Sequence, residues 1–371
     1  MFEYQQKIEP IASAIAAAAP ETDKGVFPAA AMHALGDASF LGLISSTEVG
    51  GQGLGMAAAV AVVQRIACEC TSTAMIVMMH YAATAVIEAH GPVEIRKAIA
   101  AGKHLSTLAF SELGSRSQFW APVSTATAEG SYVKLDAKKS WVTSASHADS
   151  YVWSSKPIVG TEASTLWLVP RKTAGLQALA GGFDGIGLRG NDSTPITAEA
   201  ARVPQTAMLG TDGGGFGIMM TIVLPWFNVM SAAVSCGLME AATAKTAAHA
   251  GGTKFQHAGS SIAELPTARA FIARMQIQTD MAKALLADTL AAIAAGRPDA
   301  TLRVLESKAA AGESATFVTD LAMRVCGGAA FRKEVGVERI FRDSRAASVM
   351  APTTDVLYDF IGKAVCGLPV F

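Results

Sequence analysis

Lys139-Ser140-Trp141-Val142-Thr143-Ser144 lies in the middle of the stretch of sequence that decides the fold. Around it, between about residues 105 and 210, short segments rich in β-forming residues are separated by turn residues such as Glu129-Gly130. The stretch therefore predicts a β domain. Its predicted strands are Ser106–Ser111, Val123–Ala128, Tyr132–Leu135, Tyr151–Ser155 and Thr165–Val169.

The sequence on both sides of this block is helical in character. Alanine-rich apolar stretches precede it, and after the glycine run Gly213–Gly215 long apolar stretches continue to the end. Four long helices with short connections suggest a bundle. We therefore expect an α+β fold with an N-terminal helical domain (1–105), a central β domain (106–212) and a C-terminal four-helix bundle (213–371). The predicted helices are Phe2–Ala19, Pro28–Leu41, Met56–Cys70, Thr73–Ala89 and Val93–Ala101 before the β domain, and Phe216–Ala250, Leu265–Ala295, Ala300–Val325 and Thr354–Cys366 after it.

Composition narrows the choice of partners. The chain has 371 residues, 51% of them hydrophobic and 16% charged, which is more apolar material than one core usually holds. We therefore expect further burial between subunits, in a homodimer or homotetramer. The formal net charge is -1, without long single-sign runs, so nucleic acid and acidic membrane surfaces are not expected as partners.

The five cysteines and seven histidines show no metal-binding pattern. Cys68 and Cys70 form a CxC pair without a second pair, and neither HxxxH nor HExxH occurs. We expect no metal site, and free thiols in a cytoplasmic protein. The uncharged run Ile218–Met239 is long enough to span a bilayer, but Pro225 and Asn228 interrupt it, so we expect a buried helix.

Five motifs, in this order, resemble those of the acyl-CoA dehydrogenase superfamily, and the resemblance covers nearly the whole chain. No single motif is specific, but together they imply the family's fold, with FAD as the cofactor. The motifs are Ala109–Ser117, similar to TEPGAGSD; Lys139–Ser144, similar to KxWITN; Gly187–Ser193, similar to GLRGSDT; Cys326-Gly327-Gly328, similar to GGxGY; and Val337–Asp343, similar to VERxxRD.

The resemblance also implies which residues contact the flavin. Trp141 and Thr143 match the tryptophan and threonine that lie against the ring in the family, although Trp141 alone could equally be a core residue. An aromatic wall with a few hydrogen-bond donors suits the flat apolar isoalloxazine and its polar edge. The other implied cofactor contacts are Phe110, Ser111, Ser117, Gly327, Gly328, Thr353 and Asp355.

The catalytic base of the family is missing. Desaturation of an acyl thioester needs a carboxylate that removes the α-proton. Ala351 stands where most of the family has this glutamate, and no Asp or Glu occurs between Asp343 and Asp355. The isovaleryl-type members place it instead at a position that matches Trp226-Phe227 here. We expect Trp226, Phe227, Ala351 and Tyr81 to line the substrate pocket.

Two residues are candidates for acid–base chemistry in its place. Asp355 lies one helical turn beyond Ala351, but we favour its alternative role as an N-terminal helix carboxylate stabilised by the helix dipole. His80, beside Tyr81, can titrate near neutral pH, but a lone histidine on an apolar helix is more often a core residue.

Three functions are compatible with these residues. We favour an oxygenase that acts on an acyl thioester or related small substrate of specialised metabolism through a flavin peroxide, because such chemistry needs a dry pocket rather than a base. The alternative is an acyl-CoA or acyl-carrier-protein dehydrogenase whose base is Asp355 or absent. The third is a non-catalytic flavoprotein. A flavin reductase or electron-transfer protein is the partner expected to exchange reducing equivalents.

Overall fold

The computed structural model describes residues 3–116, 118–161 and 163–370, so the expected flavin contact Ser117 lies outside the described residues. The chain divides into two compact units. The first unit holds the β domain and most of the N-terminal helical residues, while residues 60–74 of the N-terminal part belong to the second unit. The first unit holds Met1–Ala59, Met75–Asp184 and Arg189–Phe227, and the second holds Val60–Ala74, Gly185–Leu188 and Asn228–Phe371.

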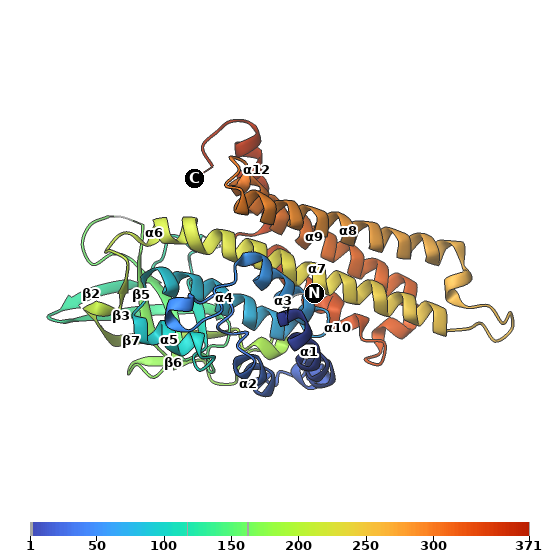
Figure 1. Cartoon of the computed structure of the whole chain (residues 1–371), viewed down its shortest axis with the longest axis horizontal. Coiled ribbons are helices and arrows are strands. Elements are labelled where there is room, and N and C mark those ends of the chain that lie inside the picture. The colour runs from blue at the N-terminus through green and yellow to red at the C-terminus, as the bar shows by residue number, and fades with distance from the viewer. Residues whose placement is uncertain (1–2, 117, 162, 371) are drawn as a thin grey trace. The chain divides into compact units, whose positions relative to one another are not determined.

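All the helices predicted before the β domain are present (Figure 1), and their limits differ from the prediction by a few residues. Apolar residues on α4 are buried almost throughout its length, which explains its low amphipathicity. These helices are α1 (Glu3–Thr22), α2 (Ala29–Asp37), α3 (Met56–Ala67), α4 (Thr71–His90) and α5 (Val93–Ala100).

The β domain consists of two four-stranded sheets, with strand orders β1-β4-β5-β8 and β2-β3-β7-β6. Within the two sheets β1 pairs with β4 in parallel, and the other strand pairs that the structure describes are antiparallel. Apolar side chains of both sheets form one core, which includes Trp153 and Trp167. The strands are β1 (Ser106–Ala109), β2 (Thr125–Glu129), β3 (Tyr132–Val142), β4 (Ser150–Ser155), β5 (Thr165–Pro170), β6 (Leu176–Ala178), β7 (Thr194–Pro204) and β8 (Met208–Leu209).

In the second unit, α9 (Ala300–Cys326) is the central helix. It packs along α8 (Pro266–Ala294), and α10 (Val337–Ser344), α11 (Ala346–Val349) and α12 (Thr354–Val365) also pack against it. The long helices α8 and α9 lie side by side in Figure 1. The predicted helical bundle is therefore confirmed, whereas α10 and α11 were not predicted.

The helix predicted over Phe216–Ala250 is interrupted near its start. It comprises α6 (Gly215–Ile218), a π-helical turn (Met219–Val223) and α7 (Leu224–Gly252). Pro225 has no N–H to donate, so a regular α-helix could not continue its hydrogen bonds there, and the wider turn precedes it.

Two helical stretches have the length and composition of membrane spans, Thr71–His90 and Gly215–Gly252. Their most apolar windows are 83% and 61% buried within the structure. This burial is what a core helix requires, and it agrees with the buried helix expected over Ile218–Met239.

Candidate active site

Trp141 is held in an unusual backbone conformation that turns its indole outward. The pairing of β3 with β7 shifts register between Lys139 and Val142, and the resulting bulge includes Trp141. Its φ is +56°, a left-handed conformation that bulky residues rarely adopt. The side chain is 67% exposed and contacts Phe183 edge-on at 6.1 Å between ring centroids. Trp141 is therefore not a core residue, and the alternative considered for it is wrong.

Thr143 lies two residues further on, in a turn that a second motif supports. Its Oγ1 lies 3.2 Å from Oγ of Ser193. The N–H of Ser144 donates to the carbonyl of Asn191 at 2.9 Å, and the N–H of Ala145 donates to that of Asp192 at 3.1 Å. The motifs at 139–144 and 187–193 thus meet at Thr143, although some fifty residues separate them in the sequence.

The loop after β1 is held by a buried ion pair. The Glu112 carboxylate accepts hydrogen bonds from the N–H groups of Val123 (2.6 Å) and Ser124 (2.9 Å), so it joins the two ends of the loop. Lys139 donates to this carboxylate and to the carbonyl of Ser154 at 2.7 Å, and both charged side chains are fully buried.

The pKa values of this pair move in the same direction for different reasons. Burial lowers the pKa of Lys139 to about 8, and Glu112 opposes that shift. Burial would raise the pKa of Glu112, but the Lys139 ammonium and the hydrogen bonds from Ser124 outweigh it, so this pKa lies below its ordinary value. Both groups are charged at neutral pH and clamp the loop onto β3.

The clamp brings Ser111 to the Trp141 bulge. The N–H of Ser140 donates to the carbonyl of Ser111 at 2.9 Å, and the buried ring of Phe110 stacks on Phe119 at 6.5 Å. An exposed indole, a pair of hydroxyls and a half-buried serine therefore lie along the end of β3. This combination fits a flat apolar ring with a polar edge, which is what isoalloxazine presents.

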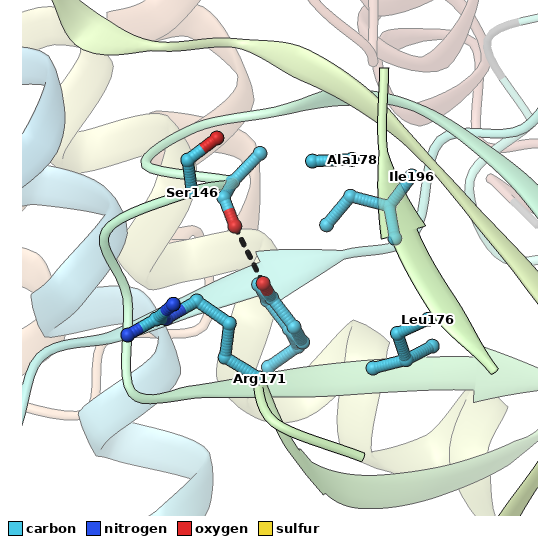
Figure 2. A pocket seen from close by; sticks show the side chains of 7 residues that line it. Ser146, Arg171, Leu176, Ala178 and Ile196 are labelled. Atoms are coloured by element: carbon cyan, nitrogen blue, oxygen red, sulfur yellow. Dashed lines mark hydrogen bonds between the residues drawn. The ribbon is translucent and has the colours of Figure 1, made fainter. Parts of the chain in front are cut away.

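A small pocket lies beside Ser146, a few residues after Thr143 in the sequence (Figure 2). Its volume is about 220 Å³. The Tyr151 hydroxyl donates to the carbonyl of Ala145 at 2.5 Å, shown as the dashed line, and Arg171 Nε donates to the carbonyl of Ala148 at 2.8 Å. These hydrogen bonds attach the turn at residues 145–148 to Tyr151 in β4 and to Arg171, directly after β5. The cavity is lined by Ala145, Ser146, Tyr151, Arg171, Leu176, Ala178 and Ile196, none of which the sequence had suggested.

His80 and Tyr81 lie in the core of the first unit. The Nε2 of His80 lies 2.9 Å from the carbonyl oxygen of Leu41, and its Nδ1 accepts the N–H of Ser106 at 3.1 Å. Burial lowers the pKa of His80 to about 4, so the ring is neutral and both nitrogens are engaged. The Tyr81 hydroxyl donates to the carbonyl of Phe40 at 2.8 Å, and burial raises its pKa. This geometry favours the structural role considered for His80.

In the second unit, the segment that contains Ala351 connects α11 to α12. Thr353 is the N-cap of α12, where its hydroxyl accepts the N–H of Val356 at 3.4 Å, and Asp355 is exposed in the first turn. Asp355 therefore lies where a helix dipole stabilises a carboxylate. Gly327 ends α9 with a φ of +56°, and it and Gly328 are exposed.

No Asp or Glu occurs between Asp343 and Asp355 or between Asp212 and Glu240. Three of the carboxylates that border these stretches have structural partners. Asp343 accepts the N–H of Leu188 at 2.6 Å, beside Gly187, where a Cβ would lie 2.6 Å from the carbonyl oxygen of Arg342. Asp212 accepts the N–H groups of Ile158 and Val159, each at 2.9 Å. Glu240 accepts from Gln64 at 2.9 Å and from Lys283.

The side chains at Ala351 and at Trp226-Phe227 are apolar, unlike these carboxylates. Ala351 is half-buried, and Trp226 and Phe227 are half-buried at the start of α7. Alanine, tryptophan and phenylalanine side chains cannot accept a proton from carbon. Among residues 3–116, 118–161 and 163–370, no group of three or more His, Cys, Asp or Glu could hold a metal ion.

Comparisons with known proteins agree with the arrangement of motifs. The family described as acyl-CoA dehydrogenase, N-terminal domain, matches residues 4–102, and the one described as acyl-CoA dehydrogenase, C-terminal domain, matches residues 213–366. The human mitochondrial short-chain specific acyl-CoA dehydrogenase is 28% identical over 347 residues, which is 91% of this chain and 83% of that protein.

Solved structures share the fold over nearly the whole chain. A glutaryl-coenzyme A dehydrogenase in complex with glutaryl-CoA superimposes with a TM-score of 0.92 at 21% identity, covering 100% of this chain and 97% of the other. The prolyl acyl carrier protein oxidase AnaB gives a TM-score of 0.86 at 20% identity, covering 97% and 98%.

The family models and the relatives identify the chain as a flavin-dependent oxidoreductase that uses FAD. The chain belongs to the acyl-CoA dehydrogenase superfamily.

Proposed function

We propose that the protein is an FAD-dependent oxygenase that acts on an acyl thioester or a related small substrate. The observation that carries this proposal is the absence of a proton-accepting side chain at both positions where the family has its base, Ala351 and Trp226-Phe227. Desaturation requires that base, whereas activation of dioxygen by a reduced flavin does not.

FAD, held by Trp141, Thr143 and Ser111, would supply the two electrons that the reduction of dioxygen requires. Insertion of one oxygen atom into the substrate consumes these electrons and two protons, and the second oxygen atom leaves as water. The reductant is a reduced nicotinamide nucleotide, acting through a flavin reductase, or a reduced electron-transfer protein. The chain's own residues bind the ring and exclude water from it.

Each residue has a defined part in this proposal. Trp141 provides the wall against the ring, and the Thr143 hydroxyl, oriented by Ser193, donates to its polar edge. Trp226 and Phe227 are apolar, and so is Ala351, so neither family position adds a charged group that would draw water to a reactive oxygen species.

The test uses isotopic dioxygen. Purified FAD-loaded protein, a reduced nicotinamide nucleotide and a flavin reductase are incubated under ¹⁸O₂ with acyl thioesters of coenzyme A and of a carrier protein. The proposal predicts a product that is heavier by one ¹⁸O atom and is absent under nitrogen. Turnover under nitrogen with an artificial electron acceptor, giving an unsaturated product without ¹⁸O, would show a dehydrogenase instead.

A further inference from the structure

The segment between α11 and α12 is fastened to α9 through one buried lysine. The Lys308 ammonium donates to the carbonyl oxygens of Ala347 at 3.3 Å, Met350 at 3.0 Å and Pro352 at 2.7 Å. Two of these carbonyls belong to the residues on either side of Ala351. The backbone that carries Ala351 is therefore fixed from both directions by a single cation.

The same face of α9 receives the rest of the segment. Gly312, one turn beyond Lys308, faces Ala347: a Cβ there would lie 3.5 Å from the Cβ of Ala347. Further along, Oγ1 of Thr319 lies 3.0 Å from Oγ of Ser344. Small and polar side chains on α9 thus let α10, α11 and the following loop approach closely, and Lys308 lies at the end of that contact.

A buried ammonium in this place is costly unless its donors are satisfied. Lys308 is 1% exposed, and burial lowers its pKa to about 7. The three carbonyl oxygens act against that shift, because each stabilises the charged form. An ammonium has three N–H donors, so the number of carbonyls matches the number of donors. Such an arrangement specifies the path of the backbone, which an apolar contact at the same place would leave free to shift.

We propose that Lys308 is a positioning residue for the reaction, because it sets the backbone of Met350–Pro352 and with it the place of the Ala351 methyl group. This rests on the proposed function only in that Ala351 lines the substrate pocket. Lys308 itself does not contact substrate or exchange protons. Its loss would widen the range of positions open to Ala351, so the substrate would be held less well.

Hydrogen exchange measured by mass spectrometry tests this on the intact FAD-loaded protein. In Lys308→Met, the peptide spanning residues 346–353 should exchange about tenfold faster than in the parent protein, through local opening, while a peptide from the middle of α8 is unchanged. The control is Lys333→Met, which removes a positive charge from an exposed loop position and should change neither peptide.

The second readout is kinetic. The substrate is the acyl thioester of coenzyme A or of a carrier protein that the isotope experiment shows to be turned over. In Lys308→Met its kcat/KM should fall about tenfold, since a small displacement of a substrate-positioning group lowers the rate by that much or more. Lys308→Gln keeps two N–H donors, so its exchange and kcat/KM should lie between those of Lys308→Met and the parent protein. This variant keeps the proposal testable should Lys308→Met fail to fold.

Two outcomes would overturn the proposal. One is unchanged exchange at residues 346–353 in both variants. The other is faster exchange to the same extent in α8, which would mean that Lys308 serves only global stability. The exchange experiment involves no substrate and no oxygen, so its result is separate from that of the isotope experiment. If the isotope experiment showed a dehydrogenase and residues 346–353 exchanged faster in Lys308→Met, the oxygenase proposal would be wrong and the positioning role of Lys308 would still be supported.

Discussion

Trp141 combines features that stability alone does not favour. A left-handed backbone costs free energy in a bulky residue, and an exposed indole contributes little to the core. The bulge at the end of β3 maintains this conformation, and we propose that the flavin ring covers the indole. Thr143 and Ser193, at the same end of the strand, would then provide the polar groups that orient the ring.

Trp141→Ala should weaken FAD binding without destabilising the protein that lacks FAD. Loss of the ring contact removes about 0.5–1.5 kcal/mol beyond the buried area, which corresponds to an increase in Kd of about two- to twelvefold. Fluorescence titration of the FAD-free protein measures this. Tyr132→Ala, at the opposite end of β3, is the matched control and should keep the parent affinity. Equal affinities in all three proteins would remove Trp141 from the flavin site.

His80 makes stability depend on pH in a defined window. Its pKa is about 4 in the folded protein, against an ordinary value of 6.5. Between these values the unfolded chain binds a proton that the folded chain excludes, so the free energy of unfolding falls as the pH drops from 6.5 to 4, by about 3 kcal/mol.

Urea unfolding at pH 7, 5 and 4 tests this contribution. His80→Gln should lose less stability than the parent protein over the window, and His33→Gln, at an exposed position, should behave as the parent does. Parallel pH profiles for the parent and His80→Gln would contradict the buried neutral imidazole. Part of the slope will remain, because burial also lowers the pKa of His104.

At this scale, the sequence predicts what lies within motifs and misses what depends on distant packing. Trp141 and Thr143 could be recognised because adjacent residues carried the resemblance. The burial of Lys308 and the buried ion pair of Lys139 could not be predicted, because lysines are usually exposed and nothing local shows that carbonyls or a carboxylate will meet them. For His80 the sequence left a catalytic and a core role open. The structure gives it a core position with two backbone partners.

Among the elements, the loop between β1 and β2 depends most on one interaction. Glu112 joins its two ends, and Lys139 ties it to β3 beside the Trp141 bulge. A buried ion pair gives little net stability, but removing one partner leaves an uncompensated charge in the interior.

Glu112→Gln or Lys139→Met alone should therefore destabilise the protein by about 3–5 kcal/mol, and the double variant by less than the sum. Urea unfolding at pH 7 measures all three. Glu94→Gln, which breaks the exposed pair with Lys97 at 3.8 Å, is the control and should have little effect. Additive losses for the double variant would show that the two side chains do not act as a pair.

Helices were predicted more completely than strands, for a physical reason. Long apolar stretches have few alternatives to a buried helix, and all nine predicted helices are present, although Pro225 divides one of them. Strand β7 was missed because Ala198 and Ala201, which are poor β-formers, occupy inward positions in the middle of the strand, where packing decides. Helices α10 and α11 are short and depend on α9 for their stability.

For the whole molecule, the order of elements could be predicted from the sequence, and the proposed chemistry rests on the missing carboxylate base. Motifs far apart in the chain meet in pairs: 139–144 with 187–193 at Thr143, and Gly187-Leu188 with Arg342-Asp343. At Ala351 and at Trp226-Phe227, where the resemblance implies a glutamate, this chain has no proton-accepting side chain.

The most direct measurement of this central claim is an anaerobic titration. The FAD-loaded protein is mixed under nitrogen with straight-chain and branched acyl-CoAs, and the flavin absorbance near 450 nm is followed, a wavelength at which oxidised flavins absorb. The account predicts that the absorbance stays unchanged with every acyl-CoA, and that Ala351→Glu, which restores a carboxylate, allows it to decline. Stoichiometric bleaching of the parent protein by any of these thioesters would contradict the account.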